Sequence, residues 1–164
     1  MREWVVAGAV IENDAGLLLV ENLRRNGATD WTPPGGVIEA DDAEDIRSGL
    51  AREVHEETGL TVAGWGELLY EVVAEAPALG WVMRAQIHLV TAVIGEVVVG
   101  NDPDGIVTDA AYVPVDACAA QLTSTHRWVS EPLTDWLGQR WSEPRSYRYR
   151  LEPHRSGPGR IVRL

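Results

Sequence analysis

The chain has 164 residues, of which 45% are hydrophobic, and a formal net charge of −11. This length predicts a single domain over residues 1–164 with a core of its own. The acidic balance excludes bulk nucleic-acid binding, which needs clustered lysine and arginine. No stretch is apolar enough to span a membrane and no signal-peptide pattern opens the chain, so we expect a cytoplasmic protein without membrane association. The single cysteine, Cys118, excludes an internal disulfide and fits a reducing compartment.

Strand-like runs surround one central helix pattern, and two further helix patterns follow. The predicted strands are at 4–11, 17–23, 62–74, 81–93 and 110–115. The third and fourth are longer than usual strands, so we expect bends in them. Helices are predicted at 115–122 and 128–140, and a short alternation at 147–151 is compatible with an edge strand. This order is typical of a mixed sheet sandwiched between helices, an α/β fold, while the tail 143–164 stays unassigned.

The segment between the second and third predicted strands carries the central helix pattern. Apolar residues at spacing four, from Ile46 to Val54, predict a helix that docks on a core. Asp41 or Asp42 is predicted to cap its start, and Gly59 is predicted to end it in the left-handed conformation.

Three carboxylates crowd one side of this helix. Glu53, Glu56 and Glu57 are three and four residues apart or adjacent, and such like charges destabilise a helix by a few tenths of a kcal/mol per pair. A divalent cation removes that penalty, and Mg²⁺ prefers carboxylate oxygens, waters and substrate phosphates as ligands. Upstream, a rigid proline turn leads into Gly35 and Gly36, which let the backbone come close to another group. For the three glutamates alone, the alternative is a solvated acidic face.

With glycines, helix and carboxylates combined, residues 35–60 resemble the Nudix box, G-x5-E-x7-R-E-U-x-E-E-x-G-U with U aliphatic. The matching residues are Gly36, Glu44, Arg52, Glu53, Val54, Glu56, Glu57, Gly59 and Leu60. The departure is that seven residues, rather than five, separate Gly36 from Glu44. We interpret this difference as a two-residue insertion in the loop 39–43. The resemblance implies the α/β/α Nudix fold over residues 3–140, with the tail after 143 not covered.

The same resemblance implies the metal and catalytic residues. Glu53, Glu56 and Glu57 are expected to hold Mg²⁺ or Mn²⁺ against a diphosphate, with Glu53 and Glu56 also counted as catalytic. Arg52 is expected to act in catalysis by orienting these carboxylates through charge-assisted hydrogen bonds. Glu44 is expected to steady the loop or the start of the helix.

The expected substrate contacts lie near the glycine corner and on later strands. Gly35 and Gly36 are expected to bring backbone donors and a carbonyl near the metal. Trp31 and Trp81 are candidates to stack a nucleobase, with core or rim packing as the alternative. The candidate arginines for an anionic substrate, which otherwise serve solubility, are Arg24, Arg25 and Arg84.

Members of the family commonly draw a further carboxylate from a later loop, as a ligand or general base. Asp109 is the first choice here, because its segment resembles the one in which relatives place a glutamate before a short strand. Asp102, Asp104 and Glu96 are rivals, each with a turn or surface role as the alternative. His126, ahead of the last predicted helix, is interpreted as a cap or an exposed residue, with contact to a substrate as the alternative.

The resemblance therefore implies a metal-dependent hydrolase that cleaves a phosphoanhydride bond in a nucleoside diphosphate linked to another moiety. One alternative is a non-catalytic nucleotide sensor, but the intact set of Glu53, Glu56 and Glu57 argues against it. Another is an enzyme like isopentenyl-diphosphate isomerase, which needs a cysteine and a glutamate flanking an allylic carbon, and Cys118 is a poor candidate for that cysteine. A small phosphorylated substrate is the expected partner, and a homodimer is compatible with the sequence.

Overall fold

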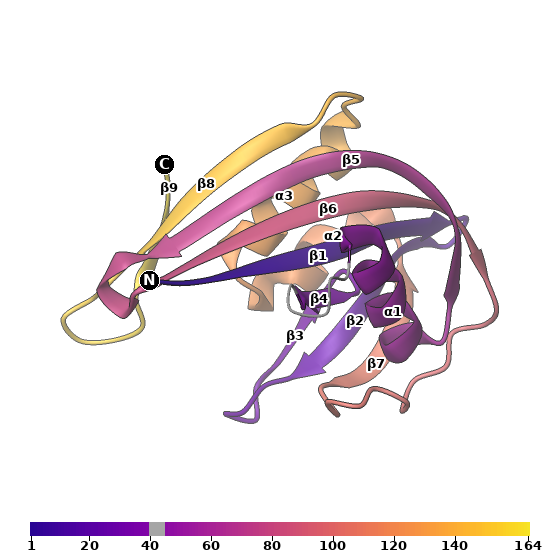
Figure 1. Ribbon diagram of the computed structural model, residues 1–164, viewed down its shortest axis with the longest axis horizontal. Coiled ribbons are helices and arrows are strands. Elements are labelled where there is room, and N and C mark those ends of the chain that lie inside the picture. Colours follow the sequence, from indigo (N-terminus) through magenta and orange to yellow (C-terminus); the bar gives the residue numbers. More distant parts are fainter. Residues whose placement is uncertain (40–44) are drawn as a thin grey trace.

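The computed structural model describes residues 1–39 and 45–164, and the strands within them form one curved mixed sheet (Figure 1). The strands are β1 (Arg2–Asn13), β2 (Gly16–Leu23), β3 (Thr29–Thr32), β4 (Gly35–Ile38), β5 (Thr61–Ala76), β6 (Trp81–Ile94), β7 (Val107–Val113), β8 (Arg145–Glu152) and β9 (Arg160–Arg163). Their order is β3-β2-β1-β6-β5-β8-β9, with β4 paired to β1 and β7 paired to β2. Strand β1 runs parallel to β6 and antiparallel to β2, so the sheet is mixed, as predicted.

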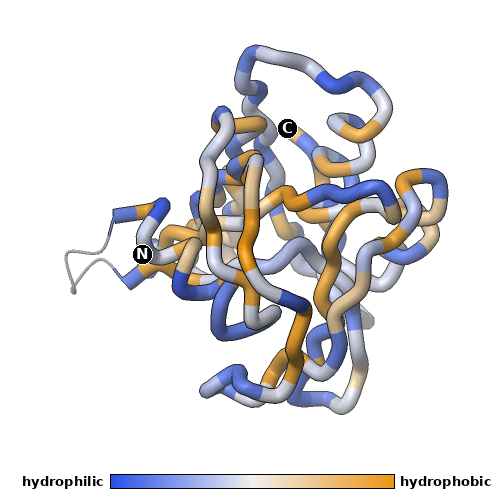
Figure 2. The backbone as a smooth tube through the Cα atoms, turned by 90° about the vertical axis from the view of Figure 1, so that its right-hand side faces the viewer, coloured by the Kyte–Doolittle hydropathy of each residue, from blue (hydrophilic) through white to orange (hydrophobic). Residues whose placement is uncertain are grey.

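Helices cover both faces of this sheet. Helix α1 (Ile46–Thr58) lies on one face, and α2 (Cys118–Gln121) and α3 (Arg127–Gln139) lie on the other. Two apolar clusters fill the spaces between the layers. Under α1, Leu50 and Val54 pack with residues of β1 and β6, while Leu133 and Trp136 of α3 pack with residues of β5 and β8 on the opposite face. Figure 2 shows the resulting pattern, with hydrophobic stretches along the strands and hydrophilic stretches in the loops.

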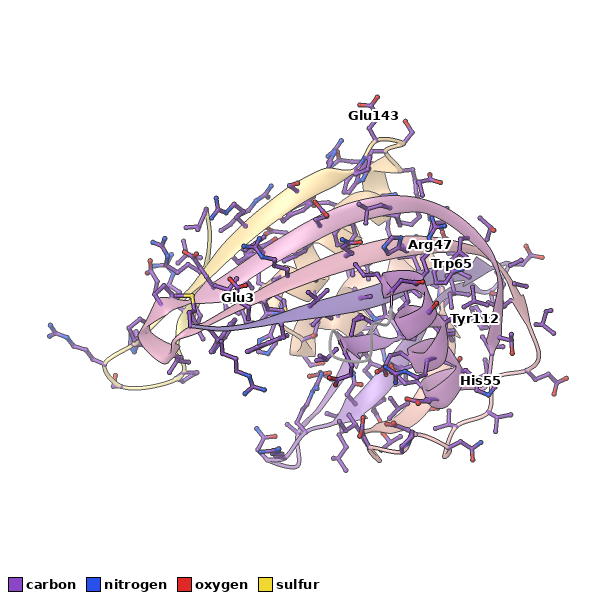
Figure 3. The ribbon with its side chains drawn as sticks, viewed as in Figure 1. Glu3, Arg47, His55, Trp65, Tyr112 and Glu143 are labelled. Carbon is purple, nitrogen blue, oxygen red and sulfur yellow. The ribbon has the colours of Figure 1, made fainter. Side chains whose placement is uncertain are left out.

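Helix α1 ends as predicted but begins later. Gly59 adopts the left-handed conformation at φ 75° and its N–H bonds to the carbonyl of His55. The N-cap is Asp45, whose side chain accepts a hydrogen bond of 2.7 Å from the amide of Ser48. The prediction of a cap at Asp41 or Asp42 is therefore wrong for the observed helix start, although those two residues lie outside the described ranges. Figure 3 places His55 on the outer side of α1, where it is exposed.

The long strands bend where the sequence predicted bends. The pairing of β5 with β6 shifts register at several points between Val62 and Tyr70. Such irregularities increase the local twist and let a long strand follow a curved sheet. The predicted helix at 115–122 is instead a series of short turns: η3 (Val115–Ala117), α2 and η4 (Leu122–Ser124). Short 3₁₀ turns are common connectors, and a segment this short gains little from a continuous helix.

The C-terminal tail belongs to the sheet. Strand β8 pairs in parallel with β5 and in antiparallel with β9. The prediction that 147–151 forms an edge strand is therefore wrong, because β9 occupies the edge. Tyr147 and Tyr149 are buried and donate hydrogen bonds to Asp135 and Glu131 of α3, which fastens the tail to that helix. Across the described ranges, every helix is too short or too polar to cross a bilayer.

Candidate active site

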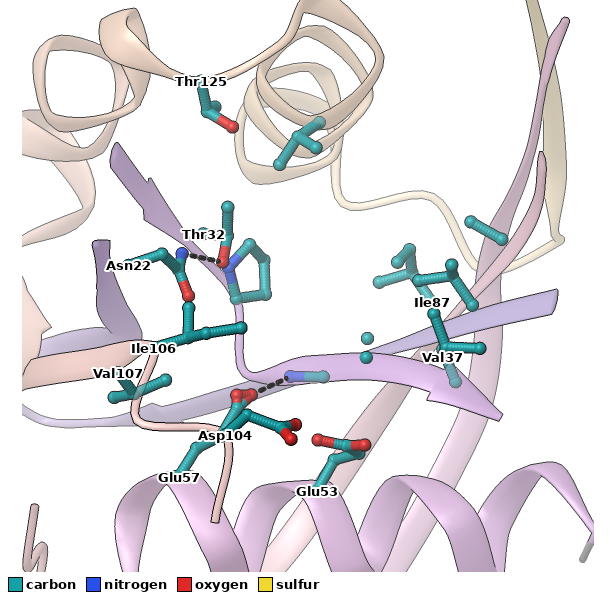
Figure 4. Close-up of a pocket in the computed structure, with 18 of the residues that line it drawn as sticks. Asn22, Thr32, Val37, Glu53, Glu57, Ile87, Asp104, Ile106, Val107 and Thr125 are labelled. Atoms are coloured by element: carbon teal, nitrogen blue, oxygen red, sulfur yellow. Dashed lines mark hydrogen bonds between the residues drawn. The ribbon is translucent and has the colours of Figure 1, made fainter. Parts of the chain in front are cut away.

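A cavity of about 970 Å³ opens between α1, the loop before β7, strands β1 to β6 and the start of α3. Its floor is apolar and includes Val6, Val72 and Met83. One end of the cavity is acidic, with the box glutamates of α1, and we call it the carboxylate end. The other end carries Asn22, Thr32, Thr125 and His126, and we call it the amide end. Figure 4 shows Glu53 and Glu57 at the first end and Asn22, Thr32 and Thr125 at the second.

The glycine corner holds the carboxylate end together. Strand β4 pairs with β1, and the amide of Gly35 donates a hydrogen bond of 2.9 Å to Oε1 of Glu57. A Cβ atom on Gly36 would lie 2.8 Å from Cδ of Glu53, so any side chain there would displace that carboxylate. A Cβ atom on Gly35 would lie 2.1 Å from the carbonyl oxygen of Ala7. Gly35 is therefore required for the close approach of β4 to β1, and Gly36 for the close approach of β4 to α1.

The carboxylates at this end are poorly solvated and lack sufficient positive charge. Burial, helped by the charges of Glu53, Asp102 and Glu56 and opposed by the Gly35 hydrogen bond, raises the pKa of Glu57 to about 8. Burial likewise raises the pKa of Glu53 to about 7, opposed by Arg52 and supported by the charges of Glu56 and Asp104. Perturbed carboxylates gathered in a cavity are characteristic of functional sites.

Arg52 bridges two of the box glutamates. Its Nη1 atom lies 3.3 Å from Oε1 of Glu53 and 3.2 Å from Oε2 of Glu56. Because both carboxylates contact the same guanidinium nitrogen, each is restricted to rotamers that reach it. This contact supports the orienting role that was predicted for Arg52.

The loop before β7 brings two aspartates to the carboxylate end. Asp102 accepts hydrogen bonds from the amides of Asp104, Ile106 and Val107, so its carboxylate holds the loop. Asp104 lines the cavity, lies beside Glu57 and Glu53 in Figure 4, and contributes to the raised pKa of Glu53. Asp109 is outside the cavity lining: it is exposed, and its carboxylate accepts a bond from the amide of Ala110.

The amide end is built by strands β2 and β3. Asn22 stands opposite Asp30 in the β2–β3 pairing, and its amide nitrogen donates to Oδ1 of Asp30 at 3.1 Å and to Oγ1 of Thr32 at 2.9 Å. Arg24 forms two further hydrogen bonds to the carboxylate of Asp30, of 2.8 and 2.9 Å. Across the cavity, the ring of His126 stacks on Trp128 with centroids 4.4 Å apart.

Comparison with known proteins agrees with this arrangement. A profile described as the NUDIX domain matches residues 2–137. The chain belongs to the Nudix family. It is 46% identical over 57 residues to a MutT-like protein of Streptomyces ambofaciens, and 46% identical over 55 residues to the Xenopus laevis nucleoside diphosphate-linked moiety X motif 6. Those matches cover 35% and 34% of this chain and only 34% and 24% of the two relatives.

Among solved structures, a MutT NUDIX hydrolase from Burkholderia pseudomallei is similar, with a TM-score of 0.65 and 25% sequence identity. The likeness covers 81% of this chain and 97% of that one. The predicted Nudix family and α/β Nudix fold are thus confirmed.

The Nudix carboxylates fit a hard cation by their chemistry. Within residues 1–39 and 45–164, no three acidic, histidine or cysteine side chains already converge as a finished metal site. The donor set is nevertheless oxygen-rich, and Glu53 and Glu57, whose pKa values are raised mainly by burial and also by neighbouring carboxylates, would be stabilised in their charged forms by a divalent cation. Glu44, which the Nudix pattern also includes, lies outside the described ranges.

Three residues singled out in the sequence lie elsewhere in this Nudix fold. Trp31 packs against the apolar cluster beneath α3, and Trp81 packs between Trp4 and Trp128, with ring centroids 5.3 and 6.2 Å away. Arg84 is exposed, and because its neighbours on β6 face the cavity, strand alternation turns Arg84 to the opposite face. These positions do not support contact with a substrate in the cavity.

The residues that sequence reasoning missed are those of the amide end. Asn22 and Thr32 sit on short strands with no motif around them, and their spacing becomes informative only when β2 and β3 are paired in register. The available signal was a polar residue interrupting the apolar run of β2, and it was too general to identify a site. His126 is the N-cap residue of α3 and is exposed, as predicted, although its side chain makes no capping hydrogen bond; it also lines the cavity.

Proposed function

We propose that this Nudix protein is a metal-dependent hydrolase that cleaves a phosphoanhydride bond in a nucleoside diphosphate linked to another moiety. The observation that carries the proposal is the pair Glu53 and Glu57, held with raised pKa values against the glycine corner at one end of a large cavity. Crowded, desolvated carboxylates are unfavourable unless a cation and an anionic ligand complete the site.

Glu53, Glu56 and Glu57 would hold Mg²⁺ or Mn²⁺ at this end. The cation, when bound, supplies charge neutralisation for the diphosphate and lowers the pKa of a bound water. Arg52 restricts the rotamers of Glu53 and Glu56 through the two contacts it makes with them. The amide of Gly35 holds one oxygen of Glu57, which leaves the other free to face the cavity.

For the general base outside the helix we propose Asp104 in place of Asp109. Both aspartates are exposed, but Asp104 lines the cavity and its carboxylate acts on the pKa of Glu53, whereas Asp109 lies outside the cavity lining. Asp102 is less suited to this role, because three backbone amides hold its carboxylate against the loop. A base at Asp104 can accept the proton of the attacking water from the loop side of the cavity.

The size and polarity of the cavity suit a nucleoside on the far side of the diphosphate. Pockets for small ligands commonly have volumes of 300–1,000 Å³ with apolar walls and a few fixed polar groups. The apolar floor and the amide end provide such a surface opposite the carboxylates. A cytoplasmic location, and a homodimer as the assembled form, remain predictions.

Neither alternative has an observation in its favour. An isomerase-like enzyme needs an accessible cysteine, but Cys118 is fully buried and its Sγ is directed at the carbonyls of Val113 and Pro114. A non-catalytic sensor requires only binding, so it gives no reason to keep Arg52 in contact with both Glu53 and Glu56 beside Glu57 on one helix face.

A substrate screen tests the proposal. The purified protein is incubated with nucleoside triphosphates, dinucleoside polyphosphates, nucleotide sugars, dinucleotide cofactors and coenzyme A, each with Mg²⁺, with Mn²⁺ and with a chelator. We expect phosphate-bond cleavage that depends on the metal. Nucleotide binding without turnover in any metal would favour the sensor and contradict the proposal.

A further inference from the structure

The most tightly constrained polar group in the cavity is the side-chain amide of Asn22. Asn22 is only 6% exposed, and its partner Asp30 is 8% exposed. Both hydrogens of the amide nitrogen are in use, one on Asp30 and one on Thr32. Asp30 is in turn fixed by the two hydrogen bonds from Arg24.

This network determines which way the amide points. An ionised carboxylate only accepts hydrogen bonds, so the nitrogen of Asn22, and not its oxygen, must face Asp30. A flipped amide would set two acceptors against each other at hydrogen-bond distance. The oxygen Oδ1 therefore points the other way, and Figure 4 shows it turned from Thr32 towards Ile106, which also lines the cavity.

The oxygen of Asn22 has no hydrogen-bond donor among residues 1–39 and 45–164. A recessed acceptor with a fixed direction and no protein partner discriminates between ligands, because a ligand without a donor leaves it unpaired and desolvated. The nitrogen of Asn22 makes the hydrogen bonds that hold the side chain in place. The oxygen is therefore suited to recognising a ligand.

We propose that Asn22 selects the base of the nucleotide by accepting a hydrogen bond from an exocyclic amine, so that adenine or cytosine is favoured over hypoxanthine or uracil. The inference rests on the proposed function for the presence of a nucleoside in the cavity. An exocyclic amine projects from its ring and reaches a recessed oxygen. In hypoxanthine and uracil a carbonyl oxygen takes the place of that amine and would lie against Oδ1 of Asn22, with the Asp30 carboxylate behind it.

Asp30 is assigned as the positioning residue for this selection. It touches no ligand, because it is outside the cavity lining, but it holds the amide in one orientation. Replacing it with asparagine lets the Asn22 amide turn over and present either its nitrogen or its oxygen. The prediction for Asp30→Asn is loss of base preference through better binding of the oxo bases, an effect that a merely structural role would not produce.

The test is an equilibrium titration in chelator, so that it needs neither metal nor turnover. Binding of CMP against UMP, and of AMP against IMP, is followed by calorimetry. We expect the parent protein to bind the amino base at least about 10-fold more tightly in each pair. In Asn22→Leu, which keeps the bulk and removes the acceptor, both preferences should disappear; Asn26→Leu, on the exposed 24–28 turn, should retain them.

Equal binding of amino and oxo bases by the parent, an unchanged preference in Asn22→Leu, or no binding of any monophosphate would each overturn the inference. If the variants fail to fold, the base preference of the unmutated protein alone still tests the inference. Metal-dependent turnover without base preference would overturn this inference and leave the proposed hydrolase in place. Base preference without turnover of any diphosphate would support the inference and overturn the hydrolase.

Discussion

The two ends of the cavity are built in opposite ways. The carboxylate end comes mainly from one continuous segment, in which the glycine corner and α1 place charged side chains against backbone. The amide end is assembled from β2, β3 and the start of α3, and its polar groups satisfy one another through side-chain hydrogen bonds. The first end is electrostatically incomplete and the second is almost complete. From this difference we propose that the first end binds a cation with the reacting group, while the second recognises a ligand by its shape and hydrogen-bonding pattern.

The largest effect should follow from removing a charge at the incomplete end. We expect Glu57→Gln to lower turnover by about 10³-fold, at the upper end of what losing one electrostatic contact costs. The amide oxygen of glutamine can still accept the bond from Gly35, so in chelator the variant should melt no lower than the parent. Steady-state assays and thermal melts measure the two effects, with the exposed Glu71→Gln on β5 as the matched control. A Glu57→Gln protein with parental turnover would show that this end is not the reaction site.

A smaller effect should separate the two aspartates of the later segment. Asp104→Asn is expected to lower turnover by about 10²-fold at saturating Mg²⁺, the lower range for a general base, while Asp109→Asn stays near the parent. The pH dependence of turnover should change only in the Asp104 variant. The opposite ranking would restore Asp109, and mild effects at both positions would leave Glu53 as the base.

The fit between glycine and glutamate gives a third comparison. In Gly36→Ala the new methyl group would lie 2.8 Å from Cδ of Glu53, so that side chain must move, and we expect a loss of turnover of about 10-fold to 100-fold. Gly138→Ala in α3 is the control, because nothing lies within 4 Å of its Cβ position. Alanine at that helical site should stabilise the protein by about 0.5–1 kcal/mol and leave turnover unchanged. Equal turnover of the two variants would show that catalysis does not depend on the position of the Glu53 side chain.

The smallest expected effect is on the pH dependence of stability without metal. The folded-state pKa values of Glu53 and Glu57 are raised to about 7 and about 8, so the folded protein binds more protons than the unfolded chain between pH 4.5 and 8. Stability from these groups is present below pH 4.5 and is lost as pH rises through 8. In chelator, the melting temperature of the parent should fall between pH 5 and 8 more than that of Glu57→Gln. Parallel curves would contradict the raised pKa of Glu57.

Sequence reasoning succeeded where function depends on neighbours along the chain. The spacing of Glu53, Glu56 and Glu57 on a helix, the end of that helix at Gly59 and the nearness of Gly35 and Gly36 all follow from local geometry. The bends of the two long strands were also foreseen, because their length exceeds what a straight strand usually has.

The predictions that depended on pairing between distant strands were less accurate. Asp109 and Arg84 were chosen by nearness to a motif or by charge, but which face of a strand they occupy is set by the registers of β7 with β2 and of β6 with β5. The β9 edge was missed because a four-residue strand carries almost no periodic signal. The partnership of Asn22 with Asp30 joins two strands across a turn, and its meaning lies in the direction of one amide, which no sequence pattern encodes.

Binding of Mn²⁺ to the parent and to Glu57→Gln, followed by electron paramagnetic resonance at pH 8.5, is a direct test of whether the carboxylate end holds a divalent cation. At that pH both perturbed carboxylates of the parent are largely ionised, given their pKa values of about 7 and about 8. We expect the parent to bind Mn²⁺, Glu57→Gln to bind it at least about 10-fold more weakly, and Glu71→Gln to match the parent. Parent protein that leaves Mn²⁺ free in solution, or a Glu57→Gln variant that binds it as tightly as the parent, would contradict a metal site that includes Glu57.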